Sequence, residues 1–264
     1  MDVSNGMPVN RRTLFRGAAL LAGGVAAAGV VDLTRSSIAS RARAAAAPQV
    51  FDRAAWGARP PVQPAQVLAN GPDHIVVHHT ASANTGDLSQ AAAFGLSRAI
   101  QNFHMDSNGW DDTGQQLTIS RGGFVMEGRN RSLQAIGARQ HVMGAHVSGE
   151  NDHTIGIENE GTYMTTGPTG QLWNSLVATC AWLCTVYGLD PQAAIVGHRD
   201  YNATACPGDV LYARLPELRN AVAAVLAGQA RPVGSSRRPR SSGLAGPRHT
   251  YDHGPALAAN EGHR

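Results

Sequence analysis

Two histidines stand where extended segments of the chain end, and a cysteine follows the second of them. His78 closes an apolar, β-branched run, His198 closes a later run, and Cys206 follows eight residues further on in a turn-rich loop. Adjacent strands of one sheet can bring such ends together, and the loop can fold back to supply a thiolate. Imidazole and thiolate favour Zn²⁺ over Mg²⁺ or Ca²⁺. The residue types therefore indicate a zinc site, although eleven histidines make chance triplets easy.

Three protein ligands would make this site catalytic rather than structural. Zinc in proteins is usually tetrahedral, so three ligands leave the fourth position to water. The pKa of such a water falls to about 7, which makes it a usable nucleophile at neutral pH. The triplet thus predicts a metallohydrolase that uses one Zn²⁺ ion.

Alternating strands and helices must position these ligands. A first strand is expected at 74–79, followed by a helix that Asp87 caps and whose apolar residues recur every three or four positions up to Phe103. Further expected elements are a hairpin at 117–120 and 124–127, strands at 154–158 and 194–198, and helices at 172–187 and 216–227. This order predicts an α/β fold in which helices cover a sheet.

The composition favours one globular domain with two appended ends. Of 264 residues, 42% are hydrophobic and 16% charged. The sequence has no run of about 18 strongly apolar residues, so a membrane-spanning helix is not expected. The net charge of +3 comes from the ends, since 47–228 holds ten arginines against fifteen acids and each end holds six against two. A mildly acidic body argues against a nucleic-acid partner.

Residues 1–46 are predicted to be a twin-arginine signal peptide. Asn10–Arg16 carries the paired arginines, and Gly17–Val31 is weakly apolar and rich in alanine and glycine. So short a run suits a signal better than an anchor, and an N-terminal helix of the domain is the alternative. We therefore expect a secreted protein, extracellular or in the cell wall, whose functional domain is 47–228.

Residues 229–264 are predicted to form a disordered, basic tail. They are mostly Gly, Pro, Ser, Ala and Arg, which bury too little apolar surface to offset the entropy of ordering. Loose attraction of the arginines to anionic wall polymers is the alternative role.

The other two cysteines are expected to be reduced thiols in the core. Cys180 and Cys184 lie one turn apart on the apolar stripe of the helix at 172–187, where a disulfide between them would be strained. No such periodicity accounts for Cys206.

The local sequences around these ligands resemble a known family. The motifs are Trp56-Gly57-Ala58-Arg59, Ile75–Ala81, Gly144-Ala145-His146, Ile155–Glu158, Gly197–Asp200 and Cys206-Pro207-Gly208. In this order they are similar to the type 2 N-acetylmuramoyl-L-alanine amidases and the peptidoglycan recognition proteins, from about Phe51 to Leu226.

The resemblance implies a single domain with a central mixed β-sheet flanked by helices. It also implies hydrolysis of the amide between the lactyl group of N-acetylmuramic acid and L-alanine in peptidoglycan. His78, His198 and Cys206 match the zinc ligands of the family. Some recognition proteins that do not hydrolyse peptidoglycan lack the cysteine, so Cys206 favours an enzyme.

Gln115 stands where many members of the family carry a tyrosine. A glutamine amide forms hydrogen bonds but does not titrate, so Gln115 cannot be a general base. We expect it to contact substrate instead.

Glu158 is the expected base. The run Ile155–Gly161 resembles the Ile-Gly-Ile-Glu-x-Glu-Gly segment of AmpD-type amidases, whose first glutamate is thought to have this role. Strand alternation directs Glu158 away from the isoleucines and toward the cleft, and an exposed strand carboxylate is the alternative. Glu160 is the second candidate, expected at the rim as a substrate-binding residue.

Three more residues receive roles from the resemblance. Thr204 stands where some relatives have a lysine, and its hydroxyl can donate to a developing oxyanion. His146 matches a histidine near the substrate and is expected to help Thr204, with a capped surface histidine as the alternative. Asn151 is expected to bind substrate.

Together these expectations describe a secreted zinc amidase of the cell wall. Its partner would be peptidoglycan or a muropeptide, and we expect a monomer. A peptidoglycan-binding module that does not hydrolyse is the alternative, because Gln115 replaces tyrosine. A zinc peptidase that cuts within the stem peptide would lack support from any HExxH motif.

Overall fold

The computed structural model describes residues 47–228 of the chain. The predicted signal peptide at 1–46 and the predicted tail at 229–264 lie outside the described residues. Within the described range, no helix is both long and apolar enough to cross a bilayer.

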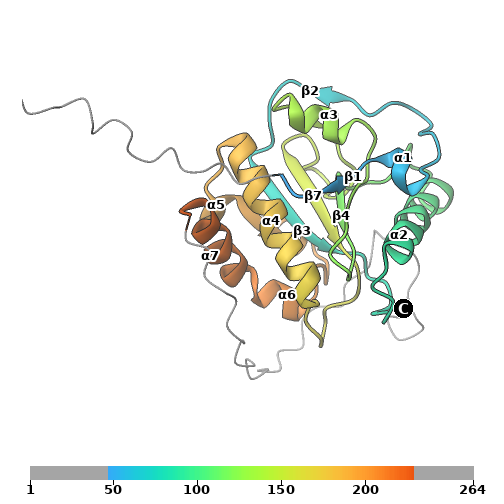
Figure 1. Ribbon diagram of the computed structural model, residues 1–264. Coiled ribbons are helices and arrows are strands. Elements are labelled where there is room, and N and C mark those ends of the chain that lie inside the picture. Colours follow the sequence, from blue (N-terminus) through green and yellow to red (C-terminus); the bar gives the residue numbers. More distant parts are fainter. Residues whose placement is uncertain (1–46, 229–264) are drawn as a thin grey trace, which may run out of the picture. The chain divides into compact units, whose positions relative to one another are not determined.

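A six-stranded mixed sheet forms the centre of the domain (Figure 1). In order across the sheet, its strands are β1 (Val50–Phe51), β5 (Val125–Glu127), β4 (Leu117–Ile119), β7 (Thr154–Asn159), β3 (His74–His79) and β8 (Ile195–Gly197). Neighbouring strands run parallel except β4 and β5, which form the expected hairpin. Two short strands, β2 (Val67–Leu68) and β6 (His141–Val142), pair separately.

Helices pack against both faces of this sheet. They are α1 (Arg53–Trp56), α2 (Gln90–Asn102), α3 (Ser132–Gly137), α4 (Gly170–Tyr187), α5 (Pro191–Ala194), α6 (Asp209–Ala213) and α7 (Leu215–Leu226), with a π-helical turn at Phe103–Ser107 and a 3₁₀ turn at His198–Asp200. The main core joins α4 and α7 to one face of the sheet. A smaller core joins α1 and α2 to Met126, on the other face of β5. The α/β class and the mixed sheet flanked by helices are thus confirmed.

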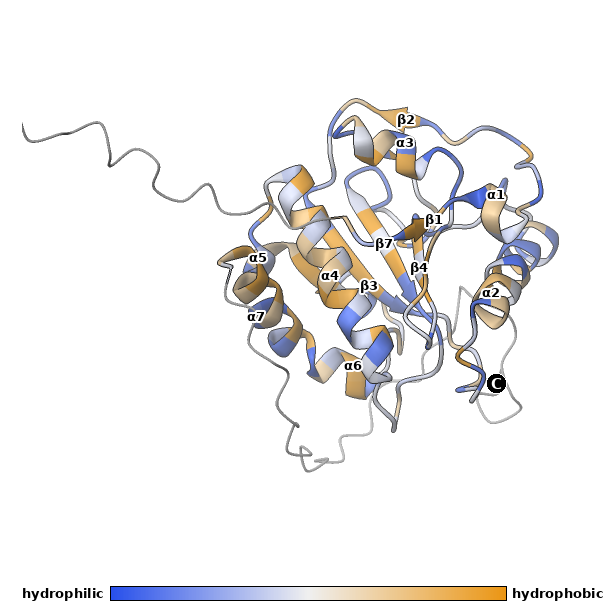
Figure 2. Ribbon diagram, in the orientation of Figure 1, coloured by the Kyte–Doolittle hydropathy of each residue, from blue (hydrophilic) through white to orange (hydrophobic). Residues whose placement is uncertain are grey.

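The strand register divides β3 and β7 into an apolar face and a polar face. Val77 lies opposite Ile157 and points into the core beneath α4, whereas His78 lies opposite Glu158 on the other face. The hydrophobic middle of both strands gives way to hydrophilic residues at one end (Figure 2). The period of two therefore buries the apolar residues against α4 and assembles polar side chains on the reverse side.

Several predicted boundaries differ from the structure by one or two residues, and two of these differences have a clear local cause. Ser89, rather than Asp87, caps α2, because the Asp87 carboxylate accepts the N–H of Ser89 at 2.9 Å and holds it in a turn before the helix. Strand β8 ends at Gly197, and His198 begins the 3₁₀ turn in which the Asp200 carboxylate accepts the Gly197 N–H at 2.7 Å. The chain therefore changes direction at His198, the second histidine of the predicted triplet.

Candidate metal centre

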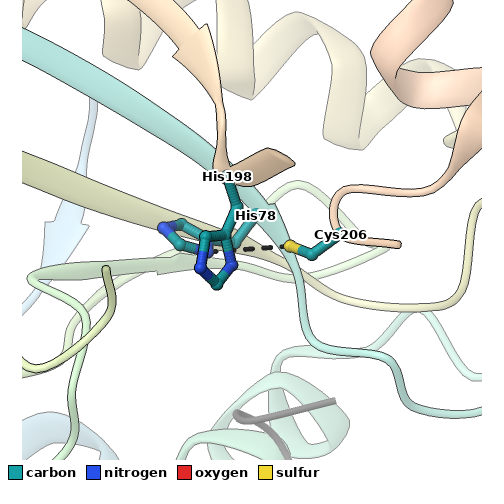
Figure 3. Close-up of side chains that lie close together, drawn as sticks. All are labelled: His78, His198 and Cys206. Atoms are coloured by element: carbon teal, nitrogen blue, oxygen red, sulfur yellow. Dashed lines mark hydrogen bonds between the residues drawn. The ribbon is translucent and has the colours of Figure 1, made fainter. Parts of the chain in front are cut away.

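The predicted triplet meets at the carboxyl ends of β3 and β8 (Figure 3). The two strands are parallel neighbours, with Val77 opposite Gly197, so the histidine that follows each position stands beside the other. The potential ligand atoms of His78, His198 and Cys206 all lie within 4.8 Å of one another, and all three side chains are buried.

Cys206 reaches the histidines because its loop is fastened to the 3₁₀ turn. The N–H of Arg199 donates to the Cys206 carbonyl at 3.1 Å, and the Arg199 guanidinium donates to the Ala205 carbonyl and to Asp209. The Cys206 sulfur then lies 3.6 Å from Nδ1 of His78. It also accepts the backbone N–H of His79 at 3.4 Å.

This arrangement fits a zinc ion. Two imidazoles and one thiolate are the donor types that zinc prefers, and their mutual distances let a single ion contact all three. Burial also favours a bound cation, because a thiolate without a counter-ion is costly in a low-dielectric interior.

Each histidine has a hydrogen-bonding partner at Nε2. Nε2 of His78 lies 3.1 Å from Nδ1 of His146, and Nε2 of His198 lies 3.1 Å from Oδ1 of Asn202. Partners of this kind fix the tautomer and the ring orientation of a metal-binding histidine. With Nε2 engaged in this way, Nδ1 of each histidine is the nitrogen that could serve as a metal ligand. Asn202 was not predicted, since an asparagine in a turn-rich loop gives no local signal of such a role.

His146 lies beside His78 rather than on the surface. Its side chain is buried, which together with the charge of His198 lowers the pKa of His146 to about 3 and keeps the ring neutral. Asn151 positions it, because Oδ1 of Asn151 accepts the backbone N–H of His146 at 2.7 Å and that of Val147 at 3.1 Å. The ring lies so close to β7 that a Cβ on Gly156 would come within 2.7 Å of it. Only glycine fits there.

Glu158 lies next to His78. It is paired with His78 across β3 and β7 and with Thr118 across β7 and β4, so the three side chains share one face. The carboxylate is fully buried, which excludes the alternative of an exposed strand residue.

Gln115 is buried close to the face of the sheet that carries His78, Glu158 and Thr118. Its side-chain amide donates to Oγ1 of Thr118 at 2.9 Å, and Thr118 is the neighbour of Glu158 on β4. Gln115 therefore contacts Thr118, which is the neighbour of the expected base Glu158. Its contact with substrate stays a prediction.

Thr204 and Glu160 lie at the edges of the site. Oγ1 of Thr204 accepts the Cys206 N–H at 3.2 Å, so the threonine is adjacent to the third ligand. The Glu160 carboxylate accepts the Arg121 N–H at 2.6 Å, beyond the end of β7. Burial raises the pKa of Glu160. The structure thus places the Thr204 hydroxyl against the backbone of Cys206 and directs Glu160 toward the loop after β4.

His79 points to the opposite side of β3 from His78. It is buried, and the N–H of Tyr163 donates to its Nδ1 at 3.4 Å. Burial and the positive charge of Arg199 lower the pKa of His79 to about 3. As expected for a residue one step along the strand, it packs in the interior and is not among the three ligands.

The sequence profile of the family Amidase_2, described as N-acetylmuramoyl-L-alanine amidase, matches residues 68–209. The matched range is more than half of the chain and contains His78, His198 and Cys206. The chain belongs to this family. The resemblance that the motifs indicated is therefore confirmed.

Relatives in the family include both amidases and recognition proteins. The human N-acetylmuramoyl-L-alanine amidase is 31% identical over 168 residues, which cover 62% of this chain but only 27% of the human protein. Peptidoglycan-recognition protein SC2 of Drosophila melanogaster is 32% identical over 169 residues, or 60% of this chain and 80% of that protein. This chain thus aligns with about a quarter of the human enzyme.

Solved structures of the family share the fold. Drosophila PGRP-LB has a TM-score of 0.55 at 26% identity, covering 63% of this chain and 92% of that one. Peptidoglycan recognition protein LE, solved in complex with tracheal cytotoxin, a monomeric diaminopimelic acid-type peptidoglycan, has a TM-score of 0.56 at 26% identity, covering 64% and 94%.

Proposed function

We propose that this protein is a secreted, zinc-dependent N-acetylmuramoyl-L-alanine amidase. Its substrate would be the amide between the lactyl group of N-acetylmuramic acid and L-alanine in peptidoglycan. The observation that carries the proposal is the buried triplet of His78, His198 and Cys206 with the Glu158 carboxylate on the strand beside it. A module that only binds peptidoglycan has no need of a thiolate and a carboxylate in this arrangement.

His78, His198 and Cys206 would hold the ion. When bound, Zn²⁺ would supply a Lewis acid that polarises the amide carbonyl and lowers the pKa of a water molecule. His146 and Asn202 keep the two imidazoles oriented through Nε2. The backbone N–H of His79 stabilises negative charge on the Cys206 sulfur.

The protein's own groups would handle the proton and the developing charge. Glu158 would accept a proton from the attacking water and pass it to the nitrogen of the leaving L-alanine. If His78 binds the ion through Nδ1, its Nε2–H would donate to Nδ1 of His146. Neutral His146 would then carry its own proton on Nε2. Thr204 accepts the Cys206 N–H and keeps its hydroxyl proton for donation. Both groups would donate to the carbonyl oxygen as it becomes negative.

Export through the twin-arginine route would place the enzyme at its substrate. The support is the Asn10–Arg16 segment with the weakly apolar run that follows it. This route carries proteins that are already folded, so the metal could be acquired before export.

Digestion of cell wall tests the proposed activity. Purified full-length protein loaded with zinc is expected to release free stem peptides with an L-alanine amino terminus, and mass spectrometry of the soluble products identifies them. Removal of the ion with a chelator should stop release, and added Zn²⁺ should restore it. Binding of peptidoglycan without release by the loaded protein would instead support the non-hydrolysing alternative. Fragments cut within the stem would indicate a peptidase.

Replacement of Asn202 by alanine is expected to weaken zinc binding. Loss of a group that orients a metal-binding histidine typically costs about 10–100-fold in metal affinity, and Asn202 also joins this loop to the backbone of Ser148. Asn202→Asp keeps the oxygen that faces His198 and should retain most of the affinity. Competition with a chromophoric chelator measures both variants. Equal affinity in Asn202→Ala and the parent would show that the contact does not support the ion.

A further inference from the structure

A second group of metal-binding side chains lies at the opposite end of the sheet from the triplet. Asp73, His74 and His153 offer ligand atoms that are all within 4.8 Å of one another. His74 begins β3, four residues before His78, which corresponds to about 13 Å along a strand. The two groups share no residue, so an ion in one would not be bound by the other.

The backbone fixes these three residues in place. The Asp73 N–H donates to the His153 carbonyl at 2.9 Å, immediately before the register that pairs His74 with Thr154. The Thr154 hydroxyl donates to the Glu150 carbonyl at 2.6 Å and closes the turn that carries His153. The pairing of β3 with β7 therefore brings the backbones of these three residues together.

The side-chain contacts converge on one carboxylate oxygen. Nδ1 of His74 and Nδ1 of His153 each lie 2.7 Å from Oδ1 of Asp73. On its other side, Nε2 of His153 lies 2.7 Å from the Glu150 carboxylate. A histidine that binds metal through one nitrogen commonly donates its other N–H to a carboxylate. Glu150 supplies that partner for His153.

We propose that Asp73, His74 and His153 form a second binding site, for a divalent transition-metal ion such as Zn²⁺. Two imidazoles and a carboxylate suit this class of ion, and the partial exposure of all three leaves room for water at the remaining positions. Both histidines would bind through Nδ1, and the ion would replace the protons now shared with Asp73. Glu150 would orient His153 without contacting the ion. This site is independent of the proposed amidase activity.

The competing arrangement is an ion pair without metal. A protonated His153 between Asp73 and Glu150 would satisfy the same distances. The two arrangements differ in the number of metal ions bound per chain. The metal site predicts two ions, whereas the ion pair predicts only the one held by the triplet.

Titration of the full-length protein with Co²⁺ and Zn²⁺ separates them. The first equivalent of Co²⁺ should give the strong near-ultraviolet charge-transfer band of a cobalt–thiolate bond, because that site contains Cys206. A second equivalent should bind without increasing the band, because Asp73, His74 and His153 include no sulfur. Cys206→Ser should lose the band and keep the second ion.

His153→Gln and Asp73→Asn should each weaken the second ion more than about tenfold while leaving the charge-transfer band intact. Asp111→Asn removes the same charge from another exposed position and should retain both ions. Melting curves recorded without metal verify that the variants are folded. A wild-type protein that binds one ion overturns the proposal, and so does a second ion that survives in both His153→Gln and Asp73→Asn.

Discussion

Cys206→Ser is expected to lower zinc affinity by on the order of a hundredfold or more and to reduce hydrolysis of peptidoglycan in parallel. Loss of a residue that merely supports a ligand costs about 10–100-fold, and Cys206 would itself be a ligand. Serine retains the contact from the His79 N–H, but its hydroxyl is not ionised at neutral pH and is a poorer zinc ligand than a thiolate. Elemental analysis of the dialysed protein and rates of stem-peptide release measure the two effects.

Cys184→Ser provides the matched control. Cys184 is a free, buried thiol on α4, and burial raises its pKa to about 12. The same atom is exchanged, but on helix α4 in the main core, outside the triplet. Its zinc content should equal that of the parent even where its melting temperature falls. Full zinc content in Cys206→Ser would remove the thiolate from the proposed site.

Glu158→Gln is expected to lower kcat/KM by about 10²–10⁴-fold, the usual contribution of general acid–base catalysis. Glutamine has nearly the same size and keeps one carbonyl oxygen, but it cannot accept and return the proton. Glu158 lies opposite His78 but is not one of the three proposed ligands. The zinc content of the variant should therefore equal that of the parent. Rates of product release, zinc analysis and a thermal melt together separate loss of chemistry from loss of structure.

Glu160→Gln makes the same exchange two residues further on. Glu160 accepts the Arg121 N–H through a carboxylate oxygen, and the amide oxygen of glutamine can replace it. We therefore expect a much smaller loss than in Glu158→Gln. The opposite order, with Glu158→Gln active and Glu160→Gln inactive, would transfer the role of base to Glu160.

Local sequence was sufficient to predict the main elements and to single out the three candidate ligands. The run at 74–79 is apolar and β-branched, and the stripe at 172–187 has a helical period and a glycine stop, so each element is determined by its own residues. A histidine at the end of each of two expected strands, with a cysteine in the loop after the second, already predicted zinc chemistry. Short strands such as β1, β2 and β6 escaped prediction, because two residues carry no period.

The positions of the groups around the ligands were decided by tertiary structure. His146 lies against His78 and Asn202 against His198 because separate loops meet over the strand ends. The start of α2 was decided by competition between Asp87 and Ser89, two residues that both cap helices well.

What the sequence determined by itself was the class of fold, the three side chains with the chemistry of a zinc site, and the carboxylate expected to work beside them. Only the parallel pairing of β3 with β7 and β8 decided that His78 has Glu158 on one side and His198 on the other. The same pairing placed His153 beside Asp73, eighty residues earlier in the chain. The physical reason is that strand periodicity sets which face a residue occupies, whereas register, fixed by hydrogen bonds between distant segments, sets its neighbours.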